Sequence, residues 1–128
     1  MRRIALLGLI VALAACNNDS TSPNGSAVGN YSLHTYDGAV LPVQLDNGQI
    51  LETDQLQLSA NGTYIDQASF QDGSTITEQG NWSISNNLIT FDDLTDGIVY
   101  NGSLSGDVLT ESFPIVGGGS TIEVYQRQ

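Results

Sequence analysis

The chain has 128 residues, of which 13% are charged, and its 14 acidic residues against 3 basic ones give a formal net charge of −11. This length allows one domain of ordinary size. The 40% of hydrophobic residues suffices for a core, which excludes a wholly disordered acidic chain. The shortage of Lys and Arg excludes nucleic acid as a partner, because such binding needs cations to displace the phosphate counterions. The single cysteine excludes a disulfide framework within the chain.

The N-terminal segment has the layout of a secretory signal peptide. Arg2 and Arg3 precede the uncharged apolar run Ile4–Ala15, and a basic start followed by a short apolar region is typical of such peptides. A transmembrane helix needs ~20 apolar residues to cross the hydrocarbon core, so this run is too short to span a membrane. We predict that residues 1–15 are a signal peptide and not a buried helix of the folded domain.

The only cysteine follows this run directly. The stretch Leu13-Ala14-Ala15-Cys16 resembles the lipobox of bacterial lipoproteins, in which the cysteine thiol is diacylated and becomes the mature N-terminus. The resemblance implies that Cys16 carries acyl chains such as palmitate, which anchor the protein to a membrane without spanning it. Each buried CH₂ of such chains contributes ~0.8 kcal/mol. No histidine lies near Cys16 in the sequence, which argues against a catalytic thiol.

The residues after Cys16 bear on where the protein is anchored. In bacteria with two membranes, Asp directly after the lipidated cysteine tends to retain a lipoprotein at the inner membrane. Residue 17 is Asn, which favours the outer membrane of the bacterial cell envelope. Residues 16–27 comprise the lipidated cysteine and a stretch rich in Asn, Ser, Thr, Pro and Gly. We predict that this stretch is a flexible tether to a domain of residues 28–128.

The domain is predicted to be all-β. From Val28 onward, short stretches rich in β-branched and aromatic residues alternate with Gly- and Asn-rich turn clusters, and no window shows helical periodicity. Gly and Asn supply the positive φ angles that tight hairpins need. Successive clusters lie about 9 to 14 residues apart, close to the spacing of a β-meander. The expected strands are 29–36, 40–46, 49–59, 63–70, 75–84, 88–92, 98–104, 107–115 and 120–127.

Alternation within these strands indicates one buried and one solvent-facing side. The apolar pairs expected on the buried side include Leu56 with Leu58, Trp82 with Ile84, and Ile122 with Val124. The last pair leaves Glu123 on the solvent side. An antiparallel meander of about eight or nine short strands has two open edges, which closure into a barrel removes. We therefore expect a closed barrel, with a two-sheet β-sandwich as the alternative.

Short motifs spread over residues 28–127 resemble the small bacterial lipocalin-like lipoproteins. They include Gly29-Asn30-Tyr31-Ser32-Leu33, Asn61-Gly62-Thr63-Tyr64, Gly80-Asn81-Trp82 and Tyr125-Gln126-Arg127. The resemblance implies a calyx-like barrel of about eight strands. It also implies a protein that usually has no enzymatic activity and often has no assigned ligand.

The resemblance further implies a closure at the base of the barrel. Gly29-Asn30-Tyr31 occupies the place of the lipocalin Gly-x-Trp signature, with Tyr where Trp is usual. In lipocalins an Arg near the end of the last strand packs over that aromatic ring, and the matching residue here is Arg127. A cation–π contact of this kind stabilises by ~0.5–2 kcal/mol. The alternative is a solvated Arg127 that contributes nothing.

Two non-enzymatic functions are compatible with such a barrel. Eight-stranded barrels hold one small ligand or are filled by their own side chains. The candidate lining for a small apolar ligand, which is equally the expected packed core, is Tyr31, Leu33, Leu58, Tyr64, Phe70, Trp82, Ile84 and Tyr100. The alternative is a protein-interaction or inhibitor module of the cell envelope with a filled barrel, whose acidic charge steers a basic partner.

The sequence contains no catalytic constellation and no cofactor motif. His34 is the only histidine, so a site with several His ligands is excluded, and its place opposite in phase to Tyr31 predicts an exposed position. Asp92, Asp93 and Asp96 form a candidate Ca²⁺ site of oxygen ligands, although the EF-hand pattern is not met. The alternative is that they are solvated turn residues. We expect a protein that is not an enzyme and has no cofactor.

Overall fold

The structure is a computed structural model and describes residues 27–115 and 117–128. The predicted signal peptide, Cys16 and the tether up to residue 26 lie outside the described residues. The described part of the chain forms ten β-strands and no helix. No described segment is therefore a helix long and apolar enough to cross a membrane.

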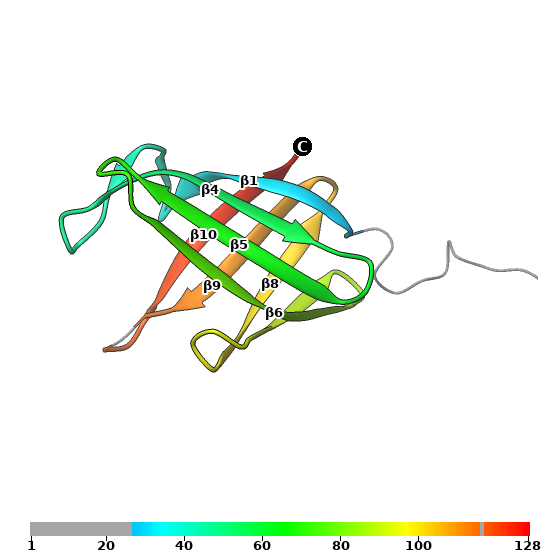
Figure 1. Cartoon of the computed structure of the whole chain (residues 1–128). Helices are drawn as coiled ribbons and strands as arrows, with labels where there is room; N and C mark the ends of the chain where they lie inside the picture. The colour runs from blue at the N-terminus through cyan, green and yellow to red at the C-terminus, as the bar shows by residue number, and fades with distance from the viewer. Residues whose placement is uncertain (1–26, 116) are drawn as a thin grey trace, which may run out of the picture.

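The strands form one antiparallel sheet that closes on itself. They are β1 (Gly29–Tyr36), β2 (Ala39–Val40), β3 (Val43–Gln44), β4 (Ile50–Leu58), β5 (Thr63–Phe70), β6 (Thr75–Ser85), β7 (Leu88–Asp93), β8 (Ile98–Ser105), β9 (Val108–Pro114) and β10 (Ser120–Arg127). From β4 to β10 each strand pairs with the next, and β1 pairs with both β10 and β4. β1 and β4–β10 are thus the eight strands of a closed barrel (Figure 1). The predicted all-β barrel is confirmed, and the sandwich alternative is wrong.

The expected continuous strand at 40–46 is wrong. Proline has no backbone N–H to donate to a strand ladder, and Pro42 divides this segment into β2 and β3, of two residues each. β2 pairs with the end of β1, and β3 pairs with the start of β4. These two short strands therefore lie at one end of the barrel, outside the closed ladder.

The face predicted for β10 is also wrong. Ile122 was expected in the core but is 43% exposed, whereas Tyr125 is fully buried. Because successive side chains alternate between the two faces of a strand, Tyr125 places Glu123 and Thr121 on the inward side. Glu123 is accordingly half-buried, and Thr121 is buried. In β4 and β6, by contrast, the predicted inward pairs do face the core.

Aromatic rings fill the middle of the barrel. The ring of Phe91 packs edge-on against Tyr64, with centroids 5.2 Å apart, and stacks on Tyr100 at 4.9 Å. Tyr100 in turn contacts Phe113 at 4.8 Å. Gly80 allows β6 and β7 to approach closely, since a Cβ there would clash with the carbonyl oxygen of Asp92. The central interior is therefore a packed core.

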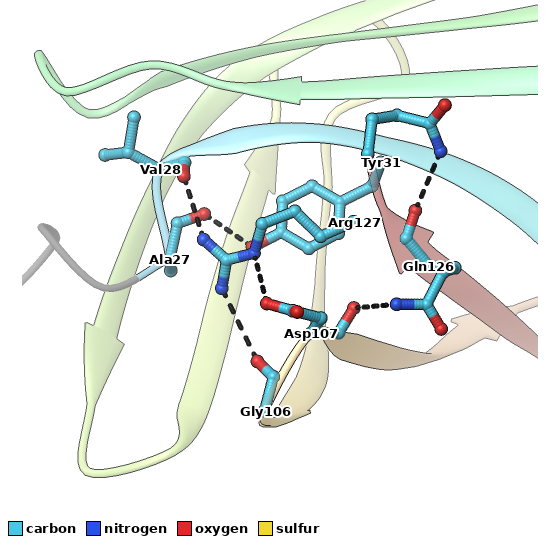
Figure 2. A network of polar contacts seen from close by, with 8 residues as sticks. Ala27, Val28, Tyr31, Gly106, Asp107, Gln126 and Arg127 are labelled. Atoms are coloured by element: carbon cyan, nitrogen blue, oxygen red, sulfur yellow. Dashed lines mark hydrogen bonds and ion pairs between the residues drawn. The ribbon is translucent and has the colours of Figure 1, made fainter.

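One end of the barrel, which we call the base, is covered by Arg127 at the end of β10 (Figure 2). Its guanidinium carbon lies 5.2 Å from the ring centroid of Tyr31. Its Nη1 donates a hydrogen bond to the carbonyl oxygen of Val28 at 3.0 Å, and its Nε lies 3.0 Å from a carboxylate oxygen of Asp107. The Tyr31 hydroxyl donates to the carbonyl oxygen of Ala27 at 2.7 Å. Arg127 thus has the placement that the lipocalin resemblance implies.

Gly29 leaves the space that Arg127 occupies. Its φ of +155° is one that L side chains rarely adopt, and a Cβ there would lie 3.4 Å from Cδ of Arg127. The Asp107 side chain is 68% exposed, so solvent weakens its ion pair with Arg127. The ring contact and the hydrogen bond to Val28 are therefore the interactions of Arg127 that we expect to matter most.

Replacing Arg127 tests whether the base contributes to stability. We predict that Arg127→Ala lowers the free energy of unfolding by about 1–3 kcal/mol, because it removes a cation–π contact and the hydrogen bonds that the charged guanidinium donates. Arg127→Lys is expected to recover only part of this loss, since an ammonium lacks the planar guanidinium fork. Urea denaturation measures the change, with Gln57→Ala on the exposed face of β4 as the control. An Arg127→Ala midpoint equal to that of the parent would contradict the prediction.

Candidate functional site

A cavity opens at the end of the barrel opposite the base, and we call this end the mouth. β10 runs from Thr121 in the cavity wall to Arg127 at the base, so the two features lie at its two ends. The cavity has a volume of about 200 Å³. Its lining residues are Tyr36, Leu45, Leu51, Asp54, Asp66, Ala68, Phe70, Ile76, Glu78, Phe113, Ile115, Thr121 and Glu123.

The cavity lining has two chemical zones. The wall is apolar, with Leu51 and Phe70 buried and with Ile76 and Ile115 half exposed toward solvent. A second zone carries the carboxyl groups of Asp54, Asp66, Glu78 and Glu123, and we call these four residues the acidic floor. The cavity can therefore contact an apolar group and a polar group at the same time.

Strand alternation brings the acidic floor inside the barrel. Asp54 has the same phase as Leu56 and Leu58 in β4, and Asp66 has the same phase as Tyr64 in β5. Both aspartates are consequently buried, at 8% and 9% exposure. The sequence carried this signal in the shared phase of acidic and apolar residues, but the prediction from the sequence gave no side for Asp54 or Asp66 and placed Glu123 on the solvent side.

Cross-strand register then places like charges opposite one another. Asp66 in β5 is the register partner of Glu78 in β6. Glu123 in β10 is the partner of the fully buried Glu111 in β9. Like charges directly opposite on one face of a sheet are destabilising. Ionising both carboxyl groups of either pair therefore carries an electrostatic cost.

Several carboxyl oxygens of these inward-facing acidic residues lack a hydrogen-bond partner. They are Oδ1 of Asp54, Oδ1 of Asp66 and Oε1 of Glu111, all of them buried. The Tyr125 hydroxyl lies 3.2 Å from Oε1 of Glu123 and 3.5 Å from Oδ2 of Asp66. A hydroxyl has one proton to donate, so Tyr125 satisfies one of these carboxyl groups at a time.

Burial favours the protonated form of these carboxyl groups. It raises the pKa of Asp66 well above its ordinary value, and a hydrogen bond with Asp54 and the charge of Asp54 add to this effect. Burial and the charge of Glu123 do the same to the pKa of Glu111. Burial also raises the pKa of Glu123 to about 7. Burial, together with a hydrogen bond that the protonated Glu78 donates to Asp96, raises the pKa of Glu78 to about 8.

The acidic floor has no Lys or Arg of the described residues near it. In residues 27–115 and 117–128, Arg127 at the base is the sole Lys or Arg side chain. His34 is exposed, as its phase predicted. The acidic floor consequently has no basic side chain of the described residues beside it.

A second acidic group lies at the turn after β7. Glu78, Asp93 and Asp96 each place one carboxylate oxygen within 4.8 Å of the other two. Asp93 is fully buried, and its Oδ1 accepts hydrogen bonds from the backbone N–H groups of Thr95 and Asp96 at 2.8 and 3.2 Å. The predicted Ca²⁺ candidates Asp93 and Asp96 thus lie together, whereas Asp92 is exposed and outside the group. Ca²⁺ takes about six to eight oxygen ligands, and this group offers three carboxylates.

The residues predicted to line a ligand site lie mainly in the packed core. Of the eight candidates, Phe70 alone contributes to the cavity at the mouth. Ile84 is half-buried against the core, and the buried remainder is Tyr31, Leu33, Leu58, Tyr64, Trp82 and Tyr100. Most of the cavity wall does not follow from the pattern of any one strand, because residues from β1, β6, β9 and the loops meet there only after closure.

Comparisons with known proteins bear on the fold. No family model and no curated protein matches the sequence. Among solved structures, a lipocalin-like protein from Bacteroides uniformis is 17% identical, with a TM-score of 0.52 over 81% of this chain and 100% of that one. A designed fluorescence-activating β-barrel has 12% identity and a TM-score of 0.48, with coverage of 84% and 99%. Fatty-acid-binding protein 1 of Echinococcus granulosus has 9% identity and a TM-score of 0.48, with coverage of 80% and 98%. The likeness to the Bacteroides protein shows that this chain has the lipocalin-like fold.

The raised pKa values predict how stability depends on pH. A carboxyl group with a raised pKa in the folded state stabilises the fold fully below its unfolded pKa of about 4.5, and this contribution is lost as the pH rises through the folded pKa. The folded pKa values of about 7 for Glu123 and about 8 for Glu78 set the upper end of this window. We therefore predict that the free energy of unfolding falls between about pH 5 and about pH 8.

Urea denaturation across this pH range measures the effect. Glu123→Gln is expected to make the pH profile flatter, because the amide removes one of the titrating groups. Glu52→Gln, at an exposed position of β4, should leave the profile unchanged. A free energy of unfolding that rises with pH over this range would show that the floor is not protonated in the folded state.

Proposed function

We propose that this protein is a lipid-anchored, non-enzymatic lipoprotein of the bacterial cell envelope, whose barrel binds a small ligand at the mouth. The observation that carries the binding role is the cavity itself. It is open to solvent at one end of a closed barrel, and its apolar wall stands beside buried carboxyl oxygens without partners. An interior packed only for stability would require neither an open cavity nor buried carboxyl oxygens without partners.

The size of the cavity limits the ligand. Ligand pockets commonly measure about 300–1,000 Å³, and this cavity is smaller, at about 200 Å³. Below it, the aromatic rings of Phe91, Tyr100 and Phe113 close the interior. The ligand is therefore a small molecule whose apolar part lies against Leu51 and Phe70.

The proposed anchoring rests on the sequence. The basic start, the short apolar run and the placement of Cys16 after Ala14 and Ala15 support removal of a signal peptide and acylation of the cysteine. Asn17 supports the outer membrane as the destination. The absence of catalytic activity is likewise a proposal, which rests on the single exposed histidine and on a sequence without a cofactor motif.

Filling the cavity tests the binding role. Ala68 is half-buried and lines the cavity, so Ala68→Phe places a ring where the ligand would lie. We predict that native mass spectrometry of the non-lipidated mature chain, made as Cys16→Ser, shows one bound molecule from a panel of six-carbon amphiphiles. We also predict that Ala68→Phe weakens this binding at least about tenfold, which is about 1.4 kcal/mol.

The matched control is Gln67→Phe, because Gln67 is the neighbouring residue of β5 and faces solvent. It should bind as the parent does. Complexes of equal affinity in the parent and in Ala68→Phe, or no complex with any member of the panel, would exclude the cavity as a ligand site. The second result would favour an interaction module with a filled barrel.

Replacing Cys16 tests the anchor. We predict that the full chain, expressed in a bacterium with two membranes, incorporates a palmitate analogue and fractionates with the outer membrane. Cys16→Ser should lose both properties, because no other side chain of the sequence is a thiol. Asn17→Asp should keep the label and move to the inner-membrane fraction. Label retained by Cys16→Ser would contradict the proposal.

A further inference from the structure

The acidic floor indicates the chemistry of the ligand. Register places Asp66 opposite Glu78 and Glu123 opposite Glu111, and the described residues place no Lys or Arg beside them. Ionising both carboxyl groups of such a pair without a cation beside them costs free energy through repulsion and desolvation. An apolar ligand would gain nothing from an acidic floor, so the arrangement favours a ligand that itself supplies positive charge.

The oxygens without partners add a geometric requirement. Oδ1 of Asp54 and Oδ1 of Asp66 belong to side chains that are more than nine-tenths buried and that line the cavity. A buried acceptor without a donor costs free energy, and a hydrogen bond to a charged donor offsets this cost. A primary ammonium group carries three N–H donors and no acceptor. A quaternary ammonium ion has the same charge but no N–H group.

We propose that the cavity binds a small primary amine with an apolar tail, whose ammonium group lies on the acidic floor between Asp54 and Asp66. The tail lies along Leu51 and Phe70 toward the half-exposed Ile76 at the mouth. This inference rests on the proposed function, that is, on a ligand in this cavity. The cavity volume of about 200 Å³ equals about seven liquid water molecules at about 30 Å³ each, which suits a short alkyl or aryl tail.

A divalent cation fits this cavity less well. Ca²⁺ takes about six to eight oxygen ligands, whereas much of the cavity wall is made of apolar side chains. The group of Glu78, Asp93 and Asp96 shares one residue with the floor but extends to the turn after β7. A cation held there would need Asp96 and would not need Asp66.

Ammonium binding is coupled to protons in the floor. Carboxyl groups that burial keeps protonated must ionise to accept the full charge of the amine, so binding releases protons to the solvent. The titratable groups that face or adjoin the floor are Tyr36 from β1, Asp37 from the turn after it, Asp54 from β4, Tyr64 and Asp66 from β5, Glu78 from β6, Asp93 from β7, Asp96 from the turn after it, Tyr100 from β8, Glu111 from β9, and Glu123 and Tyr125 from β10. Proton release distinguishes ionic binding in this cavity from simple burial of an apolar tail.

The test compares three probes of nearly equal size by titration calorimetry on the non-lipidated mature chain: hexylamine, hexan-1-ol and hexanoate. Hexylamine is expected to bind at least about tenfold more tightly than hexan-1-ol, and hexanoate is expected not to bind. Titrations in two buffers of different ionisation enthalpy should show proton release with hexylamine alone. Hexyltrimethylammonium, which has no N–H donor, should bind more weakly than hexylamine.

Substitutions test whether the amine binds at the acidic floor. Asp66→Asn keeps the shape of the side chain and is expected to weaken hexylamine binding at least about tenfold. The affinity for hexan-1-ol should not change. Asp54→Asn should act in the same direction. Asp92→Asn makes the same change at an exposed position of β7 and should have no effect. The urea midpoint of Asp66→Asn should equal or exceed that of the parent, which excludes unfolding as the cause of weaker binding.

Different results would overturn the amine proposal and the proposed ligand-binding role. Equal affinity for hexylamine and hexan-1-ol, unaffected by Asp66→Asn but lost in Ala68→Phe, would overturn the amine proposal and leave the cavity as a ligand site. Hexylamine binding that is lost in Asp96→Asn but retained in Asp66→Asn would place the cation at the turn after β7 and would also overturn it. No binding of any probe would overturn both the amine proposal and the proposed function.

Discussion

Closure of the hydrogen-bonded ladder between β1 and β4 is the constraint on which the rest of the structure depends. Once the sheet is closed, every second side chain of each barrel strand faces one small interior. Aromatic rings occupy the middle of that space. The same alternation carries Asp54, Asp66 and Glu123 inside, because they share the phase of buried apolar residues. The fold and the candidate site are thus consequences of one periodicity.

The two ends of the barrel differ in charge. At the base, the guanidinium group of Arg127 lies over Tyr31 and beside Asp107, so this cation has an aromatic and an acidic partner. At the mouth, carboxyl groups face one another, and Oδ1 of Asp54 and Oδ1 of Asp66 are buried without a hydrogen-bond partner. The base has the features expected of a stabilising closure, whereas the mouth is costly to fold. Costly polar arrangements in an interior often mark functional sites.

Part of this architecture was accessible from the sequence. Turn clusters rich in Gly and Asn located the hairpins, and the open edges of the meander predicted closure into a barrel. The resemblance to lipocalin-like lipoproteins implied the place of Arg127. Glu123 was misassigned because Ile122 and Val124 beside it are apolar, and one strand alone does not show which phase the closed barrel buries. The pairing of Asp66 with Glu78 depends on register, which only the folded sheet defines. The cavity wall likewise combines residues from distant strands and loops.

The central claim is that inward-facing carboxyl groups at the mouth are held protonated near neutral pH. Carbon-13 NMR of the Asp and Glu carboxyl carbons, followed across pH, measures this directly. The structure predicts a distinct set of resonances, including Glu123 and Glu78, that titrate at about pH 7 to 8, well above the ordinary range of about 4 to 4.5. Exposed acids such as Glu52 serve as internal references. If every carboxyl carbon titrates within the ordinary range, the acidic floor does not exist as described.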